Sequence, residues 1–250
     1  MSEAFLDMIK KVGKDIAAES GRDVEGEYVF NVTELVTCPK MTYLYRTTPI
    51  DEEQLGFYSV YAAYAAKLGG IFHTALQTLI NGKSEVPVEE TFMHPSGCCS
   101  ITIKGRADIV YRNSVIEIKT FNGSNGYNMF KVNHLMQLVY YMKMLGKGKG
   151  FLVYANRCKP EMIVIEVSKD SYHGPISFND LVEKIVNMIR ANAVMIVDWL
   201  REDKPAEEIT GYRGEWCNYC PFKKMCKKRA EWTRVLRSIE FTKVKHYRLG

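Results

Sequence analysis

Two carboxylates and a lysine lie close together around a short turn in the middle of the chain. Residues 105–119 alternate in the manner of two strands joined by a two-residue turn at Arg112-Asn113. In that register Asp108 lies directly opposite Glu117, and opposed residues share one face of a hairpin with Cβ atoms about 5 Å apart. Lys119 is two residues beyond Glu117, so we expect it on the same face.

Such an arrangement has a direct chemical use. Two opposed carboxylates repel each other, so either one is protonated or a cation lies between them. Hard oxygen ligands suit Mg²⁺ or Mn²⁺, and a metal held in this way lowers the pKa of bound water and polarises a phosphate. Lys119 can neutralise charge that develops during the reaction. The alternative is an ordinary solvated charge ladder, because Arg106 lies opposite Lys119 in the same register.

Two pairs of polar residues at helical spacing flank this hairpin. His73 lies four residues before Gln77 in an alanine-rich stretch. Gln137 and Tyr141 are also four apart, in the segment that follows the Glu-Ile-Lys strand, so they share one helix face. Each pair alone is weak evidence, since a single histidine on an apolar helix is more often structural than a ligand.

The order of elements predicts an α/β protein. Turn residues and hydrophobic periodicity predict helices over 1–20, a short stretch after a Thr33 N-cap that includes Cys38, 57–81, 128–145 and 178–202. They predict strands over 86–93, 98–104, 106–111, 114–120, 150–155 and 161–167. Ile116 and Ile118 are expected to point into the core. A single mixed core with helical and cysteine-bearing additions follows.

Three cysteines form a compact array near the end of the chain. Cys217 and Cys220 are followed by Cys226, and the distant Cys38 is the candidate for the fourth ligand that three thiolates need. Four thiolates suit either structural zinc or an iron–sulfur cluster, and free thiols are the third alternative. The remaining cysteines, Cys98, Cys99 and Cys158, are expected to be buried structural thiols, with a small chance that the adjacent pair supplies a ligand.

Composition sets the class of protein. The 250 residues are 46% hydrophobic and 25% charged, which excludes collagen-like, disordered and disulfide-scaffold chains. The start of the chain lacks a basic, apolar secretory signal, and the 57–80 stretch is too polar for a membrane span, so a reducing cytoplasm without membrane contact is expected. Residues 213–250 carry a net charge of +8, and the preceding part −3. A basic tail suggests a polyanionic partner such as nucleic acid, and a solvated helical face is an equal alternative on charge alone.

Taken together, four motifs resemble those of RecB-type nucleases in the PD-(D/E)xK superfamily. They are Gly-x-x-x-His at 69–73, Gly-x-x-Asp at 105–108, Glu-x-Lys at 117–119 and Gln-x-x-x-Tyr at 137–141. The resemblance implies a restriction-endonuclease-like fold, with a mixed central sheet flanked by helices. It implies that His73, Asp108, Glu117 and the Ile118 carbonyl bind Mg²⁺ or Mn²⁺, that Lys119 is the catalytic lysine, and that Gln137 and Tyr141 lie beside the site and help to hold DNA. Glu90 is a further acidic candidate.

The cysteine pattern sharpens this resemblance. One early cysteine and a later C-x2-C-x5-C group are similar to the CRISPR-associated exonuclease family, the fourth of the core Cas proteins. The resemblance implies a [4Fe–4S] cluster on Cys38, Cys217, Cys220 and Cys226, and 5′→3′ exonuclease action on single-stranded DNA or duplex ends, with endonuclease activity as an addition. It also implies that the protein trims DNA for spacer acquisition together with the Cas integrase. The resemblance is compatible with a homo-oligomer.

Three parts are expected along the chain: a helical extension over 1–32, a nuclease core over 57–202, and a cluster region formed by 33–56 and 203–250. Basic residues of the tail are expected to guide DNA, namely Lys223, Lys224, Lys227, Lys228 and Arg229. Alternatives within the superfamily are a recombination, repair or virus-encoded exonuclease. Alternatives of other classes are a non-catalytic iron–sulfur DNA-binding module and a redox sensor.

Overall fold

The computed structural model describes residues 27–48, 69–121, 131–218, 220–224, 226, 229–231 and 240–248. The predicted helix over 1–20 and the first part of the predicted helix over 57–81 lie outside these residues. In the part of the chain that is described, no helix is long and apolar enough to cross a membrane.

The chain divides into two compact units. The first contains residues 1–67, 91–103 and 191–232, and the second contains residues 68–90, 104–190 and 233–250. The two long strands and the longest helix contribute residues to both units. The three-part division expected from the sequence stays a prediction.

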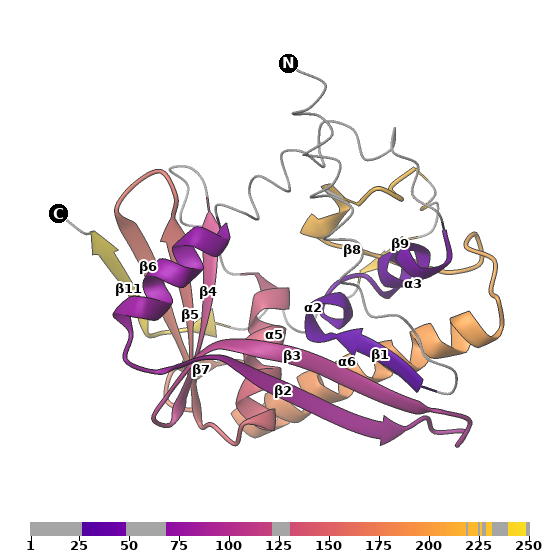
Figure 1. The fold of residues 1–250 in the computed structure, drawn as a ribbon, viewed down its shortest axis with the longest axis horizontal. Coiled ribbons are helices and arrows are strands. Elements are labelled where there is room, and N and C mark those ends of the chain that lie inside the picture. The colour runs from indigo at the N-terminus through magenta and orange to yellow at the C-terminus, as the bar shows by residue number, and fades with distance from the viewer. Residues whose placement is uncertain are drawn as a thin grey trace, which may run out of the picture. The chain divides into compact units, whose positions relative to one another are not determined.

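The elements follow one another in an α/β order (Figure 1). The described residues form the helices α2 (Val32–Leu35), α3 (Pro39–Thr47), α5 (Val132–Met144) and α6 (Phe178–Arg201), and a further helix over 69–79. The strands are β1 (Glu27–Asn31), β2 (Lys83–Met93), β3 (Ser100–Tyr111), β4 (Ser114–Phe121), β5 (Lys149–Asn156), β6 (Glu161–Ser168), β7 (Tyr172–His173), β8 (Gly211–Arg213), β9 (Arg229–Glu231), β10 (Glu240–Phe241) and β11 (Val244–Arg248). Glu215–Asn218 forms a short 3₁₀ helix.

The main sheet is mixed. Its strand order is β1-β3-β4-β5-β6-β11, and β2 pairs with β3 outside this path. Strands β4 and β5 are parallel, whereas β3–β4, β5–β6 and β6–β11 are antiparallel. Because β4 and β5 are parallel, the chain between them must cross over, and α5 makes that crossover and packs on both strands. The restriction-endonuclease-like fold class expected from the sequence is therefore confirmed.

Helices cover both faces of the second unit's sheet. Leu76 and Ile80 pack against Ile109, Ile118 and Val153 on one face. On β5, Gly150 has the opposite parity to Val153, and it leaves room for the Leu138 and Met142 side chains of α5. The two helices therefore lie on opposite sides of the sheet, and the predicted inward direction of Ile118 is confirmed, since it is fully buried.

Local sequence explains where α6 begins. The Ser177 hydroxyl donates to the Asp180 carboxylate and accepts the Asp180 backbone N–H, so one of the free backbone donors of the first turn is satisfied. The buried positions of α6 recur at three and four residues along one stripe, as in Leu181, Ile185 and Ile189.

Several sequence-based boundaries were wrong. Strands 98–104 and 106–111 form the single strand β3, because Gly105 does not interrupt it. The N-cap of α2 is Asn31 rather than Thr33, with the Glu34 carboxylate accepting the Asn31 N–H, and Cys38 lies at the N-cap of α3 rather than inside a helix. Strand β11 was not anticipated, although it pairs with β6 along five residues.

Candidate active site

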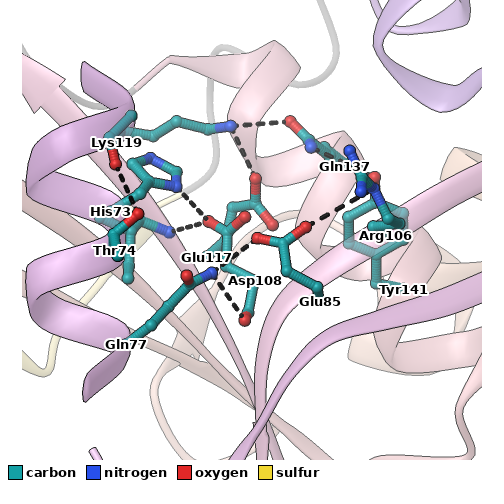
Figure 2. A network of polar contacts seen from close by, with 12 residues as sticks. His73, Thr74, Gln77, Glu85, Arg106, Asp108, Glu117, Lys119, Gln137 and Tyr141 are labelled. Carbon is teal, nitrogen blue, oxygen red and sulfur yellow. Dashed lines mark hydrogen bonds and ion pairs between the residues drawn. The ribbon is translucent and has the colours of Figure 1, made fainter. Parts of the chain in front are cut away.

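The β3–β4 hairpin brings the two carboxylates together as expected. The observed pairs include Ile109 with Ile116 and Tyr111 with Ser114, which is the predicted register. Asp108, only 8% exposed, accepts the Ile118 backbone N–H at 2.6 Å through Oδ2. This hydrogen bond holds the Asp108 carboxylate next to β4, the strand that carries Glu117 (Figure 2).

Glu117 is a strongly perturbed group of the site. Its side chain is buried, Oε1 accepts from Lys119 Nζ at 2.7 Å, and Oε2 has no hydrogen-bond partner among the residues that the structure describes. Burial disfavours the charged form and raises the pKa of Glu117 to about 7, with the Asp108 charge acting in the same direction and Lys119 opposing both. A buried carboxylate oxygen without a partner is costly unless a cation or proton satisfies it.

Lys119 is held between two elements. Its Nζ donates to Glu117 Oε1 and, at 2.9 Å, to Oε1 of Gln137 on α5. Gln137 Nε2 in turn donates to the Tyr141 hydroxyl at 3.3 Å, so both residues of the helical pair reach the same network. A Cβ on Gly105 would lie 2.7 Å from the Tyr141 hydroxyl, so glycine is needed here for the close approach of the ring.

The helix over residues 69–79 adds His73 and Gln77. His73 Nδ1 lies 3.5 Å from Asp108 Oδ2. Burial alone lowers the pKa of His73, but the hydrogen bond and charge of Asp108 raise it above its usual value. Gln77 Nε2 donates to the Asp108 backbone carbonyl at 3.2 Å, which ties this helix to β3.

The donors of this site fit a divalent cation in their chemistry. Asp108 and Glu117 offer carboxylate oxygens, His73 offers an imidazole nitrogen, and the unpartnered Glu117 Oε2 has a lone pair to donate. In the described residues, no three His, Cys, Asp or Glu side chains are grouped closely enough to hold a metal ion as they stand. The Asp108–His73 and Glu117–Lys119 contacts would therefore have to rearrange on metal binding.

Sequence reasoning missed Glu85 in this network, and its further acidic candidate, Glu90, has other partners. Glu85 lies beside Gln77 and Arg106, and no local pattern distinguished it from other strand residues (Figure 2). The Glu90 carboxylate is bonded instead by Arg190 on α6 and by the Tyr140 hydroxyl at 3.0 Å. The Glu90 carboxylate thus forms an ion pair with Arg190.

The four cysteines lie together in the first unit. Cys38, Cys217, Cys220 and Cys226 all line one small cavity, together with Lys40 and Phe222. The Tyr212 backbone N–H donates to Cys38 Sγ at 3.2 Å, and burial raises the pKa of Cys220 to about 11. The cavity thus gathers four soft ligands from both ends of the sequence.

The structure also describes the other three cysteines and two of the basic residues expected to guide DNA. Only Cys99 is buried, so the prediction of buried thiols was wrong for Cys98 and Cys158, which are exposed. Lys223 and Lys224 are exposed. Lys227, Lys228 and the Arg229 side chain lie outside the described residues.

Comparison with known proteins identifies the family of the chain. Residues 81–227 match the model of the PD-(D/E)XK nuclease superfamily. The chain is 36% identical over 138 residues to the CRISPR-associated exonuclease Cas4 of Saccharolobus solfataricus (strain ATCC 35092 / DSM 1617 / JCM 11322 / P2), an alignment that covers 52% of this chain. The chain spans about 65% of the length of that relative.

One solved structure shows the same fold. The crystal structure of SSO0001 matches with a TM-score of 0.57 and 24% sequence identity, covering 92% of this chain and 98% of that one. The family match covers more than half of the sequence and includes both carboxylates, the lysine, and the Gln137–Tyr141 pair. The chain belongs to the PD-(D/E)XK nuclease superfamily.

Proposed function

We propose that this protein is a metal-dependent nuclease that hydrolyses phosphodiester bonds in DNA. The observation that carries the proposal is the buried Glu117 carboxylate next to Asp108. One of its oxygens accepts from Lys119, and the other has no partner in the described part of the chain. A purely structural ion pair with Lys119 would not require Glu117 Oε2. In a site that receives a cation and a phosphate, this oxygen has a role, because it can bind the cation.

The protein's own groups divide the work. Asp108, Glu117, His73 and the Ile118 carbonyl would hold the cation, which when bound polarises the phosphate and lowers the pKa of an attacking water. Lys119 places a positive charge beside the bound phosphate and stabilises the negative charge that develops on it. Gln137 keeps the Lys119 ammonium in place through its 2.9 Å bond, and so restricts the lysine to one geometry.

The finer activity follows from the resemblance. We propose 5′→3′ exonuclease action on single-stranded DNA or on duplex ends, with endonuclease activity as an addition, in trimming DNA for spacer acquisition beside the Cas integrase. The Cas4 relative carries the word exonuclease in its name, which supports this choice. A recombination, repair or viral exonuclease is the alternative within the superfamily.

The cysteines are proposed to hold a [4Fe–4S] cluster, with zinc as the alternative. Support comes from the shared cavity, which brings Cys38 to a group of cysteines 179 residues later. Tying together segments so far apart in sequence stabilises the fold. The basic residues after this array, namely Lys223, Lys224, Lys227, Lys228 and Arg229, are proposed to contact DNA phosphates.

End-labelled single-stranded DNA tests the proposal. Purified protein is incubated with Mg²⁺ or Mn²⁺, and Lys119→Ala is compared with Lys143→Ala, which loses only an exposed ion pair to Glu183. We expect the wild type and Lys143→Ala to shorten the DNA and Lys119→Ala to leave it intact, and the labelled end reports the polarity. If all three proteins retard the DNA on the gel without cleaving it, the chain is a binding module.

A further inference from the structure

Glu85 adopts a backbone conformation that glutamate rarely takes. Its φ is +52°, in the left-handed region, within the otherwise extended strand β2. A non-glycine residue is strained there, and such strain persists only where the surrounding structure enforces it. Glu85 lies at the edge of the active site (Figure 2).

Both oxygens of the Glu85 carboxylate are engaged by residues of that site. Oε1 accepts from Gln77 Nε2 at 2.7 Å, and Oε2 lies 3.5 Å from Arg106 Nε. The same Gln77 nitrogen donates to the backbone carbonyl of Asp108. Glu85 is therefore linked through Gln77, by two hydrogen bonds, to Asp108, whose carboxylate is proposed to bind the metal.

Arg106 has the features of a phosphate-binding residue. It lies two residues before Asp108 on β3, and alternate residues of a strand point to the same face. Its side chain is 72% exposed, so the guanidinium is open to a polymer that approaches the site. Guanidinium groups match phosphate oxygens with two parallel hydrogen bonds.

We propose that Arg106 binds a phosphate of the DNA strand beside the scissile one, and that Glu85 holds Arg106 in place until the phosphate displaces it. The Glu85 carboxylate contacts the Arg106 guanidinium where a phosphate oxygen would bind. When DNA binds, its phosphate replaces the Glu85 carboxylate at Arg106. Glu85 therefore positions the arginine and also competes with DNA for it. This inference rests on the proposed nuclease function, since it names the group that receives the DNA next to the metal ligands.

Binding and cleavage of fluorescent single-stranded DNA by the full-length protein test the pair. Binding is measured in EDTA, so that cleavage does not interfere, and kcat and KM are measured with Mn²⁺. Because an exposed ion pair is worth little, we expect Glu85→Gln to tighten the DNA Kd by about 1.5- to 5-fold and to lower KM by a similar factor. Arg106→Ala should weaken binding and reduce the slope of log Kd against log salt by about 0.7.

The chain offers a matched control on the same two strands. Glu89 of β2 pairs with Lys104 of β3 at 3.7 Å, and Glu89→Gln makes the same change of net charge as Glu85→Gln. We expect Glu89→Gln to leave the Kd unchanged. In an Arg106→Ala background, Glu85→Gln should also have no effect, because the group it releases is missing.

Each outcome separates the inference from the proposed function. The inference is overturned if Glu85→Gln and Glu89→Gln act alike, or if the effect of Glu85→Gln survives without Arg106. It is also overturned if Glu85→Gln abolishes stabilisation of the protein by Mn²⁺, since Glu85 would then be a metal ligand. Wild-type protein that binds DNA without cleaving it contradicts the nuclease function alone, and protein that fails to bind DNA contradicts both.

Discussion

Glu117→Gln removes a carboxyl group whose pKa burial raises to about 7 from an unfolded value near 4.5. The folded, metal-free protein thus prefers the protonated acid, whereas the unfolded chain ionises it at a lower pH. The stability that follows from this preference is fully present below pH 4.5 and is lost as the pH rises through 7. The pKa difference corresponds to about 3 kcal/mol over that whole range.

Most of this loss falls within an accessible window. Between pH 5 and pH 8, wild-type protein in EDTA should lose about 2–3 kcal/mol of unfolding free energy relative to Glu117→Gln, whose amide does not titrate. The assay is denaturant unfolding at both pH values. Glu89→Gln is the matched control, and it should follow the wild type, because Glu89 is exposed.

Binding of a divalent cation should restore the lost unfolding free energy in the wild type but not in Glu117→Gln. The metal binds the ionised carboxylate and so competes with the proton, which makes stabilisation by Mn²⁺ stronger at pH 8 than at pH 5. His73 acts in the same direction, since Asp108 raises its pKa and a metal needs the neutral imidazole. Parallel stability curves for the wild type and Glu117→Gln from pH 5 to pH 8 would refute the reasoning, because Glu117 would then ionise normally.

Three further predictions concern other parts of the account. Lys119→Ala should reduce the single-turnover cleavage rate by about 100- to 1,000-fold while leaving the Mn²⁺ affinity within a few-fold, as measured by rapid quench and titration. Gly105→Ala places a methyl group 2.7 Å from the Tyr141 hydroxyl, so it should lower the unfolding free energy by about 1–3 kcal/mol and slow cleavage, and unchanged values in both assays would contradict that packing. The wild type should contain iron or zinc by elemental analysis, Cys220→Ala should lose it, and Cys158→Ala, at an exposed position, should retain it.

Alternation was a sound guide to the centre of the site. The β3–β4 register follows from which residues must be buried, since a shift by one residue would expose Ile118 and bury Lys119. Helical spacing likewise placed Gln137 and Tyr141 on one face, where they now form a hydrogen bond.

Features that depend on distant partners could not be predicted in this way. Gly105 has the local signature of a break, yet it serves a close approach of Tyr141 from a helix 36 residues later. Strand β11 is largely exposed and polar, so only its pairing with β6 makes it a strand. The left-handed backbone of Glu85 has no sequence signal, because glutamate disfavours that conformation.

The most direct test of the central claim is the cleavage rate of labelled single-stranded DNA by Asp108→Asn across a Mg²⁺ and Mn²⁺ titration. Asparagine keeps the shape of the side chain and its capacity to accept the Ile118 N–H, but it removes the charge that a cation requires. We predict that the wild type cleaves only with a divalent cation, and that Asp108→Asn is slower by at least about 100-fold with unchanged folding. Cleavage by the wild type in EDTA, or an Asp108→Asn rate equal to that of the wild type, would contradict a metal-dependent nuclease built on this hairpin.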